Sequence, residues 1–129
     1  MRNSFRKSER IVSQKTVEEL FGGGKSHSMS AFPLRLVYMV KPRQAGSAAM
    51  ILVSVPKKRL KLAVDRNRVK RQVREAYRLA KHLLDDSVAD NQQVLMAFVW
   101  TANETMPSQT VRERTEKLLN RMKEQLQKK

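Results

Sequence analysis

The chain has 129 residues, of which 27 are Lys or Arg and 12 are Asp or Glu, so its formal net charge is +15. That length fits one domain, 1–129, and a hydrophobic fraction of 40% is enough for a modest core. The charge predicts a polyanionic partner, and the absence of Cys excludes disulfides, Cys-ligated zinc and a Cys nucleophile.

The first ten residues are polar and basic, which predicts an extended arm at 1–10. No apolar core of an export signal follows the arm. No run in the chain approaches the roughly 18 apolar residues that a membrane-spanning helix requires. We therefore expect a cytoplasmic protein without a membrane partner.

The first regular element predicted is a helix that follows Ser13, a good N-cap residue, and ends at Gly22-Gly23-Gly24. Its apolar residues at helical spacing are Val17, Leu20 and Phe21. The adjoining Gly24-Lys25-Ser26 is similar to the end of a phosphate-binding loop, but Glu19 stands where that motif requires its first Gly. We interpret the glycines as a helix stop followed by a turn.

Three strands are predicted from the hydrophobic pattern. The first, 32–40, places alternate apolar residues on one face, namely Phe32, Leu34, Leu36, Tyr38 and Val40. After a turn-rich segment, the short apolar run 49–55 is closed by Pro56, and we expect these two strands to pair as a hairpin. The third strand, 94–100, is apolar on both faces.

Two further helices are predicted. One begins near Val64 or Asp65, with Asp65 as its cap, and runs to about Leu84. The other begins within 105–108, and its tail, 125–129, is expected to fray. Its apolar stripe consists of Val111, Thr115, Leu118, Leu119, Met122 and Leu126. The order of elements indicates an α+β fold in which helices pack on a small sheet.

Positive charge is concentrated in the segment 57–74, which has nine basic residues and a single acid, Asp65. At about 100° per residue, one side of the predicted helix is apolar and consists of Val69, Val73, Ala76, Ala80 and Leu84. Another side carries Arg66, Lys70 and Arg74 in one row, with Asn67, Arg71 and Arg78 beside it. Like charges at this spacing repel one another, so the row favours a phosphate backbone as partner over a merely solvated helix face.

The run Arg66-Asn67-Arg68-Val69-Lys70-Arg71, followed by Arg74-Glu75 and an aromatic, resembles the "RNR" signature of the bacterial ribonuclease P protein family. The arm around Phe5-Arg6 and the helix end Leu20-Phe21 are also similar to that family, so the resemblance extends over nearly the whole chain. It implies the order αβββαβα. It also implies a two-layer sandwich with a mixed four-stranded sheet, including a short strand near 27–30.

The resemblance implies the protein subunit of a ribonucleoprotein that removes the 5′ leader from precursor tRNA. The partners implied are ribonuclease P RNA and precursor tRNA, with no small-molecule substrate, and Mg²⁺ would belong to the RNA subunit. The residues implied to bind RNA are Arg66, Asn67, Arg68, Lys70, Arg71, Arg74, Lys57 and Lys58. A cleft beside the first helix would hold the leader against Phe21, with Val17 where some members have a second aromatic. The alternative for Phe21 is a place in the core.

No residues in the chain have the spacing of a catalytic or metal site of its own. Asp85 and Asp86 are adjacent, so on a helix they would point about 100° apart, and His27 and His82 are isolated. Two other functions stay open. One is a ribosomal or general RNA-binding protein without catalysis, and the other is a DNA-binding protein that places the basic helix in a major groove.

Overall fold

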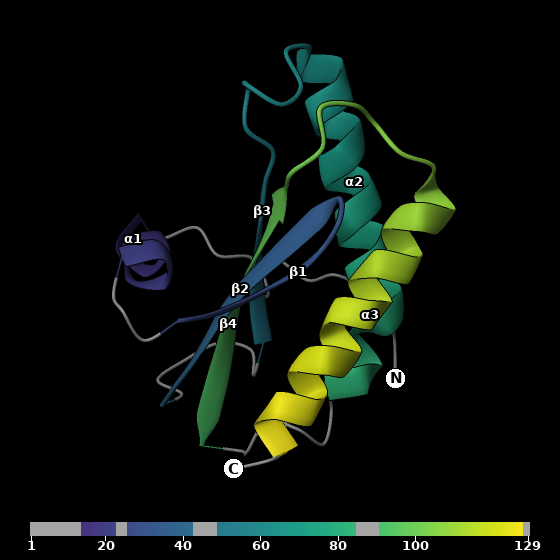
Figure 1. Cartoon of the computed structure of the whole chain (residues 1–129). Coiled ribbons are helices and arrows are strands. Elements are labelled where there is room, and N and C mark those ends of the chain that lie inside the picture. The colour runs from purple at the N-terminus through teal and green to yellow at the C-terminus, as the bar shows by residue number, and fades with distance from the viewer. Residues whose placement is uncertain (1–13, 23–25, 43–48, 85–90, 128–129) are drawn as a thin grey trace.

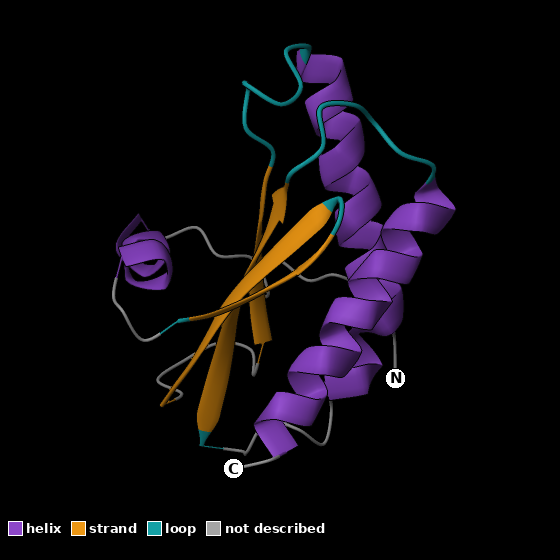
Figure 2. Cartoon of the chain, viewed as in Figure 1, coloured by secondary structure: helices purple, strands orange, loops and turns teal. Residues whose placement is uncertain are grey.

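A computed structural model of the chain describes residues 14–22, 26–42, 49–84 and 91–127. The elements are α1 (Gln14–Gly22), β1 (His27–Ala31), β2 (Leu34–Pro42), β3 (Ala49–Ser54), α2 (Ala63–Ala80), the 3₁₀ turn η2 (Lys81–Leu84), β4 (Gln92–Trp100) and α3 (Ser108–Gln127). This order confirms the predicted α+β fold, and Figure 2 shows its helices and strands. The predicted arm 1–10 lies outside the described residues. The last helix continues to Gln127, beyond residue 125, where fraying was predicted to begin.

The four strands form one mixed sheet in the order β1-β2-β4-β3. Neighbouring strands are antiparallel except for β3 and β4, which are parallel. The predicted hairpin between 32–40 and 49–55 is therefore wrong, because β4 lies between those two strands. Almost all residues of β4 are buried because this interior strand contributes to the cores on both faces of the sheet. The hairpin partner of β2 is β1, the short strand that only the family resemblance implied.

Helices α2 and α3 pack together against one face of the sheet, whereas α1 lies alone against the other face (Figure 1). The larger core cluster fills the α2–α3 side and includes Leu36, Tyr38, Val69, Val73, Phe98, Trp100 and Leu118. The smaller cluster lies under α1 and consists of Leu20, Val37, Met39, Leu95 and Ala97. The sheet and the α2–α3 pair thus form the two predicted layers. No helix among the described residues has the length and apolar character needed to span a membrane.

Phe32 does not belong to the core face to which the alternating pattern assigned it. Its side chain is 62% exposed, whereas Leu34, two residues later, is 1% exposed. Strand β2 begins only at Leu34, and Phe32 and Pro33 form the turn that joins it to β1. The strict alternation of a strand therefore does not extend back to Phe32.

Helix α2 begins at Ala63, one residue before the predicted start, and Leu62 occupies the N-cap position without a side-chain cap hydrogen bond. The prediction that Asp65 caps the helix is wrong, since Asp65 lies within the first turn, where its charge still favours the helix dipole. The entry is fixed instead by Arg66, whose Nη1 donates to the carbonyl oxygens of Leu60, at 3.0 Å, and Lys61, at 2.8 Å. The predicted end near Leu84 corresponds to the end of η2.

Candidate nucleic-acid interface

The basic residues of α2 lie on the sides of the helix that do not pack on the sheet. The packed side consists of Val69, Val73, Ala76, Tyr77 and Ala80, all of them buried. We call the basic surface of α2 the set Arg66, Asn67, Arg68, Lys70, Arg71 and Arg74. Within it Asn67, Arg68 and Arg71 are exposed and the other three are half-buried. The exposed residues are therefore Asn67 and Arg71, which were predicted to lie beside the row, together with Arg68, and the row itself is half-buried.

Arg66 has a structural role that its place in the basic run did not reveal. The two hydrogen bonds from its Nη1 hold the loop that leads into α2. A guanidinium group has five N–H donors, so Nε and Nη2 are not used by these bonds. Its binding to RNA stays a prediction, but part of its charge already stabilises the helix entry.

The positive surface ends near Arg78, because that residue is paired with the nearby acid. Arg78 Nε donates to Glu75 Oε1 at 2.8 Å, and this hydrogen bond raises the pKa of Arg78 above its usual value.

Gln72, in the same helix, contacts the start of α3. Its Nε2 donates to Met106 O at 3.1 Å and to Ser108 Oγ at 3.0 Å. Gln72 thereby ties α2 to the start of α3. Its sequence position within a basic run gave no signal of this positioning role.

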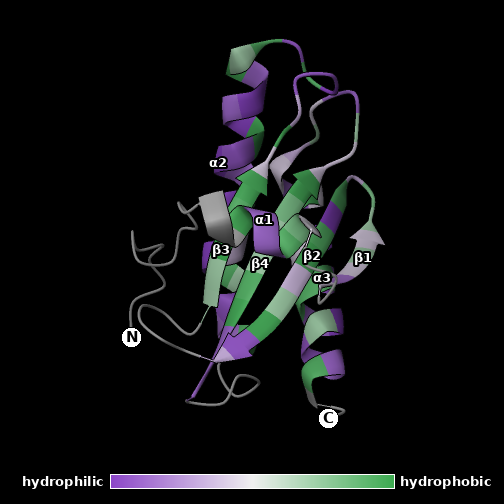
Figure 3. Cartoon of the chain, turned by 90° about the vertical axis from the view of Figure 1, so that its left-hand side faces the viewer, coloured by the Kyte–Doolittle hydropathy of each residue, from purple (hydrophilic) through white to green (hydrophobic). Residues whose placement is uncertain are grey.

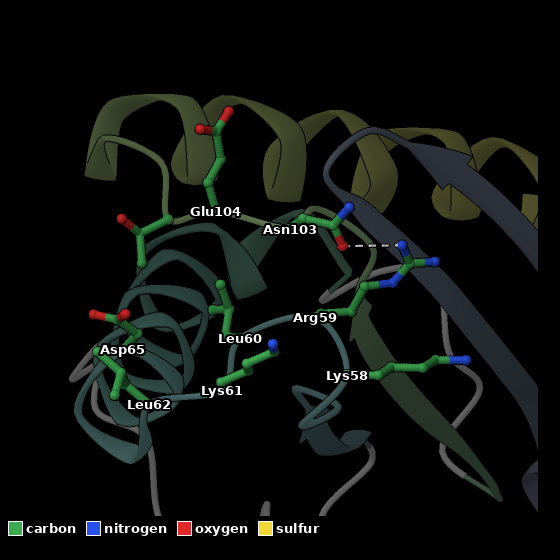
Figure 4. Close-up of a pocket in the computed structure, with 9 residues that line it drawn as sticks. Lys58, Arg59, Leu60, Lys61, Leu62, Asp65, Asn103 and Glu104 are labelled. Atoms are coloured by element: carbon green, nitrogen blue, oxygen red, sulfur yellow. Dashed lines mark hydrogen bonds between the residues drawn. The ribbon is translucent and has the colours of Figure 1, made fainter.

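An open hollow of about 520 Å³ adjoins the start of α2 (Figure 4). Its lining comes from the segment before α2, the first turn of α2 and the β4–α3 loop, and consists of Lys58, Arg59, Leu60, Lys61, Leu62, Asp65, Asn103, Glu104 and Thr105. Arg59 Nη1 donates to Asn103 Oδ1 at 3.2 Å and so bridges the two segments. Lys57 and Lys58, both predicted to bind RNA, are exposed at this same end of the sheet.

The other candidate surface is the sheet face that carries α1, where Phe21 is 49% exposed. The alternative that Phe21 is a core residue is therefore wrong, because Leu20 takes the buried position at the end of this helix. Val17 is half-buried against the smaller core cluster. Figure 3 views this face, with α1 in front of the largely hydrophobic strands. Glu19 Oε2 lies 3.9 Å from Lys41 Nζ, so an ion pair helps to hold α1 on the sheet.

Nowhere in the described ranges do three His, Asp or Glu side chains come together as a potential metal site. What the described side chains offer is guanidinium, ammonium and amide donors on one helix, and an exposed aromatic ring on another. Such groups bind phosphates and stack on bases. The arrangement is therefore suited to binding nucleic acid, and RNA binding by these residues stays a prediction.

Comparison with known proteins identifies one family. A family model described as Ribonuclease P matches residues 5–123. The ribonuclease P protein component of Porphyromonas gingivalis is 42% identical over 117 residues, which cover 90% of this chain and 84% of that protein. The protein of the same name from Chlorobaculum tepidum is 44% identical over 64 residues, 45% of this chain and 42% of that protein.

Two solved structures share the fold. The RNase P protein of Staphylococcus aureus aligns with a TM-score of 0.65 at 22% identity, over 90% of this chain and 96% of that one. The RNase P protein of Thermotoga maritima aligns with a TM-score of 0.64 at 21% identity, over 88% of this chain and 96% of that one. At these low identities, the likeness supports the order and packing of the elements rather than the role of any residue.

Proposed function

Because the chain belongs to the ribonuclease P protein family, whose role is the 5′ maturation of tRNA, we propose that it binds two RNAs through two separate surfaces. It is the protein component of a ribonucleoprotein endoribonuclease, and ribonuclease P RNA is its partner. In the proposal, the basic surface of α2 binds that RNA. The face beside α1 binds the 5′ leader of precursor tRNA.

The observation that supports the first surface is the one-sidedness of α2. Val69 and Val73 are 0% exposed in the core, while Arg68 and Arg71 extend into solvent from the same stretch of helix. Arg can hold a phosphate through two parallel hydrogen bonds, and each neutralised phosphate releases counterions. Asn67, exposed next to Arg68, supplies an uncharged donor and acceptor that can fix register.

The protein's contribution to cleavage in this proposal is electrostatic and positional. Ribonuclease P RNA and precursor tRNA are both polyanions, and a chain of net charge +15 reduces their mutual repulsion. In the same proposal, the cleavage chemistry comes from magnesium held by the RNA subunit. Less magnesium is then needed to bring the two RNAs together. We further propose a cytoplasmic location, in keeping with a chain that has no Cys for disulfides.

Reconstitution tests this function. Bacterial ribonuclease P RNA and precursor tRNA are incubated at low magnesium, with and without the protein, and leader removal is followed over time. We expect the protein to raise the cleavage rate and the affinity for substrate with a leader. A protein that binds both RNAs but leaves cleavage unchanged would instead be a general RNA-binding protein. Preference for duplex DNA in competition at fixed salt would favour the DNA-binding alternative.

The second surface gives a separate prediction. Phe21→Ala is expected to weaken binding of precursor tRNA by about tenfold, since stacking of one base on an aromatic ring contributes about 1–3 kcal/mol. The measurement is the affinity of the reconstituted holoenzyme for precursor tRNA and for mature tRNA, which lacks the leader. Affinity for mature tRNA should not change, and Phe21→Trp should bind the precursor as the wild type does. An equal loss for both tRNAs would contradict a leader contact at Phe21.

A further inference from the structure

The turn between β1 and β2 presents an aromatic ring to solvent from a backbone that is held on two sides. Phe32 is 62% exposed. On one side, Arg114 Nε, from α3, donates to the carbonyl oxygen of Phe32 at 3.0 Å. On the other, the backbone N–H of Thr101, just after β4, donates to the carbonyl oxygen of Pro33 at 2.9 Å. The ring is thus exposed while the chain that carries it is anchored to the rest of the fold.

Positive charge surrounds this turn. Arg121 Nη1 donates to Ser30 O at 2.9 Å, so a second arginine of α3 lies along β1. Arg59 lies near the same end of the sheet, bonded to Asn103 two residues beyond Thr101. We call the hairpin-tip surface the set Phe32, Arg59, Asn103, Arg114 and Arg121.

The arginines of this surface have N–H donors that remain available to a ligand. Among the described residues, no carboxylate forms an ion pair with Arg59, Arg114 or Arg121. Each uses one nitrogen on an acceptor of its own chain, which leaves further N–H donors on each guanidinium group. A single exposed Phe needs no explanation on its own. An exposed ring on an anchored turn, flanked by arginines that have no carboxylate partner among the described residues, matches the stacking and phosphate contacts that bind unpaired nucleotides.

We propose that Phe32 stacks on an unpaired base of ribonuclease P RNA, while Arg114 and Arg121 bind the phosphates that flank this base. The inference rests on the proposed function, because it adds a second contact area to the same RNA. It extends the interface from the basic surface of α2 to the neighbouring β1–β2 turn.

The position of the turn indicates which of the two RNAs Phe32 contacts. Its anchor Arg114 belongs to α3, on the face opposite α1 and Phe21 (Figure 1). Arg59 lies between the turn and the start of α2, since it both lines the hollow that includes Asp65 and bonds to Asn103 (Figure 4). The hairpin-tip surface therefore adjoins the surface proposed for ribonuclease P RNA and lies away from the one proposed for the leader.

The test is a titration of ribonuclease P RNA, without substrate, by the wild type, Phe32→Ala, Phe32→Leu and Phe32→Trp. We expect Phe32→Ala to bind roughly tenfold more weakly and Phe32→Trp to bind as the wild type does, because any π face can stack. Phe32→Leu should resemble Phe32→Ala, which separates stacking from simple apolar contact. The dependence of affinity on salt should keep its slope in all variants, because none loses a phosphate contact. Thermal unfolding of each variant checks that the exposed position leaves the fold intact.

Phe21→Ala is the matched control, since it removes the same ring from the opposite face. It should leave the affinity for ribonuclease P RNA unchanged. If the wild type activates cleavage but Phe32→Ala binds this RNA as tightly as the wild type, the inference is wrong and the proposed function stands. If Phe32→Ala weakens only the binding of leader-bearing precursor tRNA, the RNA assigned to the turn is wrong. Failure of the wild type to bind or activate the RNA at all would overturn the proposed function itself.

Discussion

Replacement of both Arg68 and Arg71 by Ala is expected to weaken binding of ribonuclease P RNA by roughly a hundredfold. A hydrogen bond to a charged group contributes about 1.5–3 kcal/mol, and about 1.4 kcal/mol corresponds to a tenfold change in affinity. The slope of log affinity against log salt concentration should become shallower by nearly two units, about one for each lost phosphate contact. Affinity is therefore measured at several salt concentrations and constant magnesium.

The fold should survive this double substitution. Both side chains are exposed on α2 and away from the apolar side formed by Val69 and Val73. Ala has a higher helix propensity than Arg, and removal of two like charges lowers repulsion along the helix. We therefore expect unchanged or slightly increased stability in thermal unfolding. A loss of RNA affinity would then report on the interface and not on the amount of folded protein.

A matched control removes the same amount of charge from another helix. Arg112 and Lys117 are both exposed on α3, and Arg112→Ala with Lys117→Ala also lowers the net charge by two. We expect a much smaller loss of affinity and a nearly unchanged salt slope. Equal losses in the two double variants would mean that total charge, and not the basic surface of α2, determines binding.

Helix α2 and strand β4 show what a hydrophobic pattern can predict. In α2, the period of about 3.6 residues placed Val69, Val73 and Ala80 on the buried side, and all three are buried. In β4, an apolar run without alternation predicted burial on both faces, as the structure confirms. In both elements the signal is strong because the burial of each residue follows directly from the geometry of its own element.

The hydrophobic pattern could not predict the order of the strands or the roles of single polar residues. A strand's pattern shows how it is buried but not which strand lies beside it, so β3 was wrongly paired with β2. Strand β1 has mostly exposed residues and gave no pattern of its own. Arg66 and Gln72 anchor neighbouring backbone through side-chain donors, and their partners lie in loops whose course the sequence does not reveal.

A second substitution with a large expected effect addresses the core. Phe98→Ala should lower the free energy of unfolding by about 3–5 kcal/mol, the usual range for a buried Phe. Phe98 is 0% exposed in the central strand, and its ring centroid lies 6.3 Å from that of Tyr77 of α2, with 57° between the planes. The substitution therefore leaves a cavity between the sheet and the helix that carries the basic surface.

Small domains are stable by about 5–15 kcal/mol, so a loss of this size removes a large part of the total. Urea unfolding should show a lower midpoint with a similar slope. Binding of ribonuclease P RNA should fall only as far as the folded fraction falls, and its salt slope should not change, because no phosphate contact is removed. A variant that stays fully folded yet loses affinity would contradict a purely structural role for Phe98.

Phe→Ala at positions 21 and 32 provides the comparison, because the same atoms leave the protein in all three variants. Those two rings are 49% and 62% exposed, so we expect each substitution to cost well under half as much stability as Phe98→Ala. Phe21→Ala should then affect the leader and Phe32→Ala the ribonuclease P RNA, each without unfolding, whereas Phe98→Ala should affect stability first and binding only through it. Similar stability losses at all three positions would contradict the burial that separates them. The contrast follows from position alone: a ring between the sheet and α2 holds the binding surface in place, and a ring on the outside is available to the RNA.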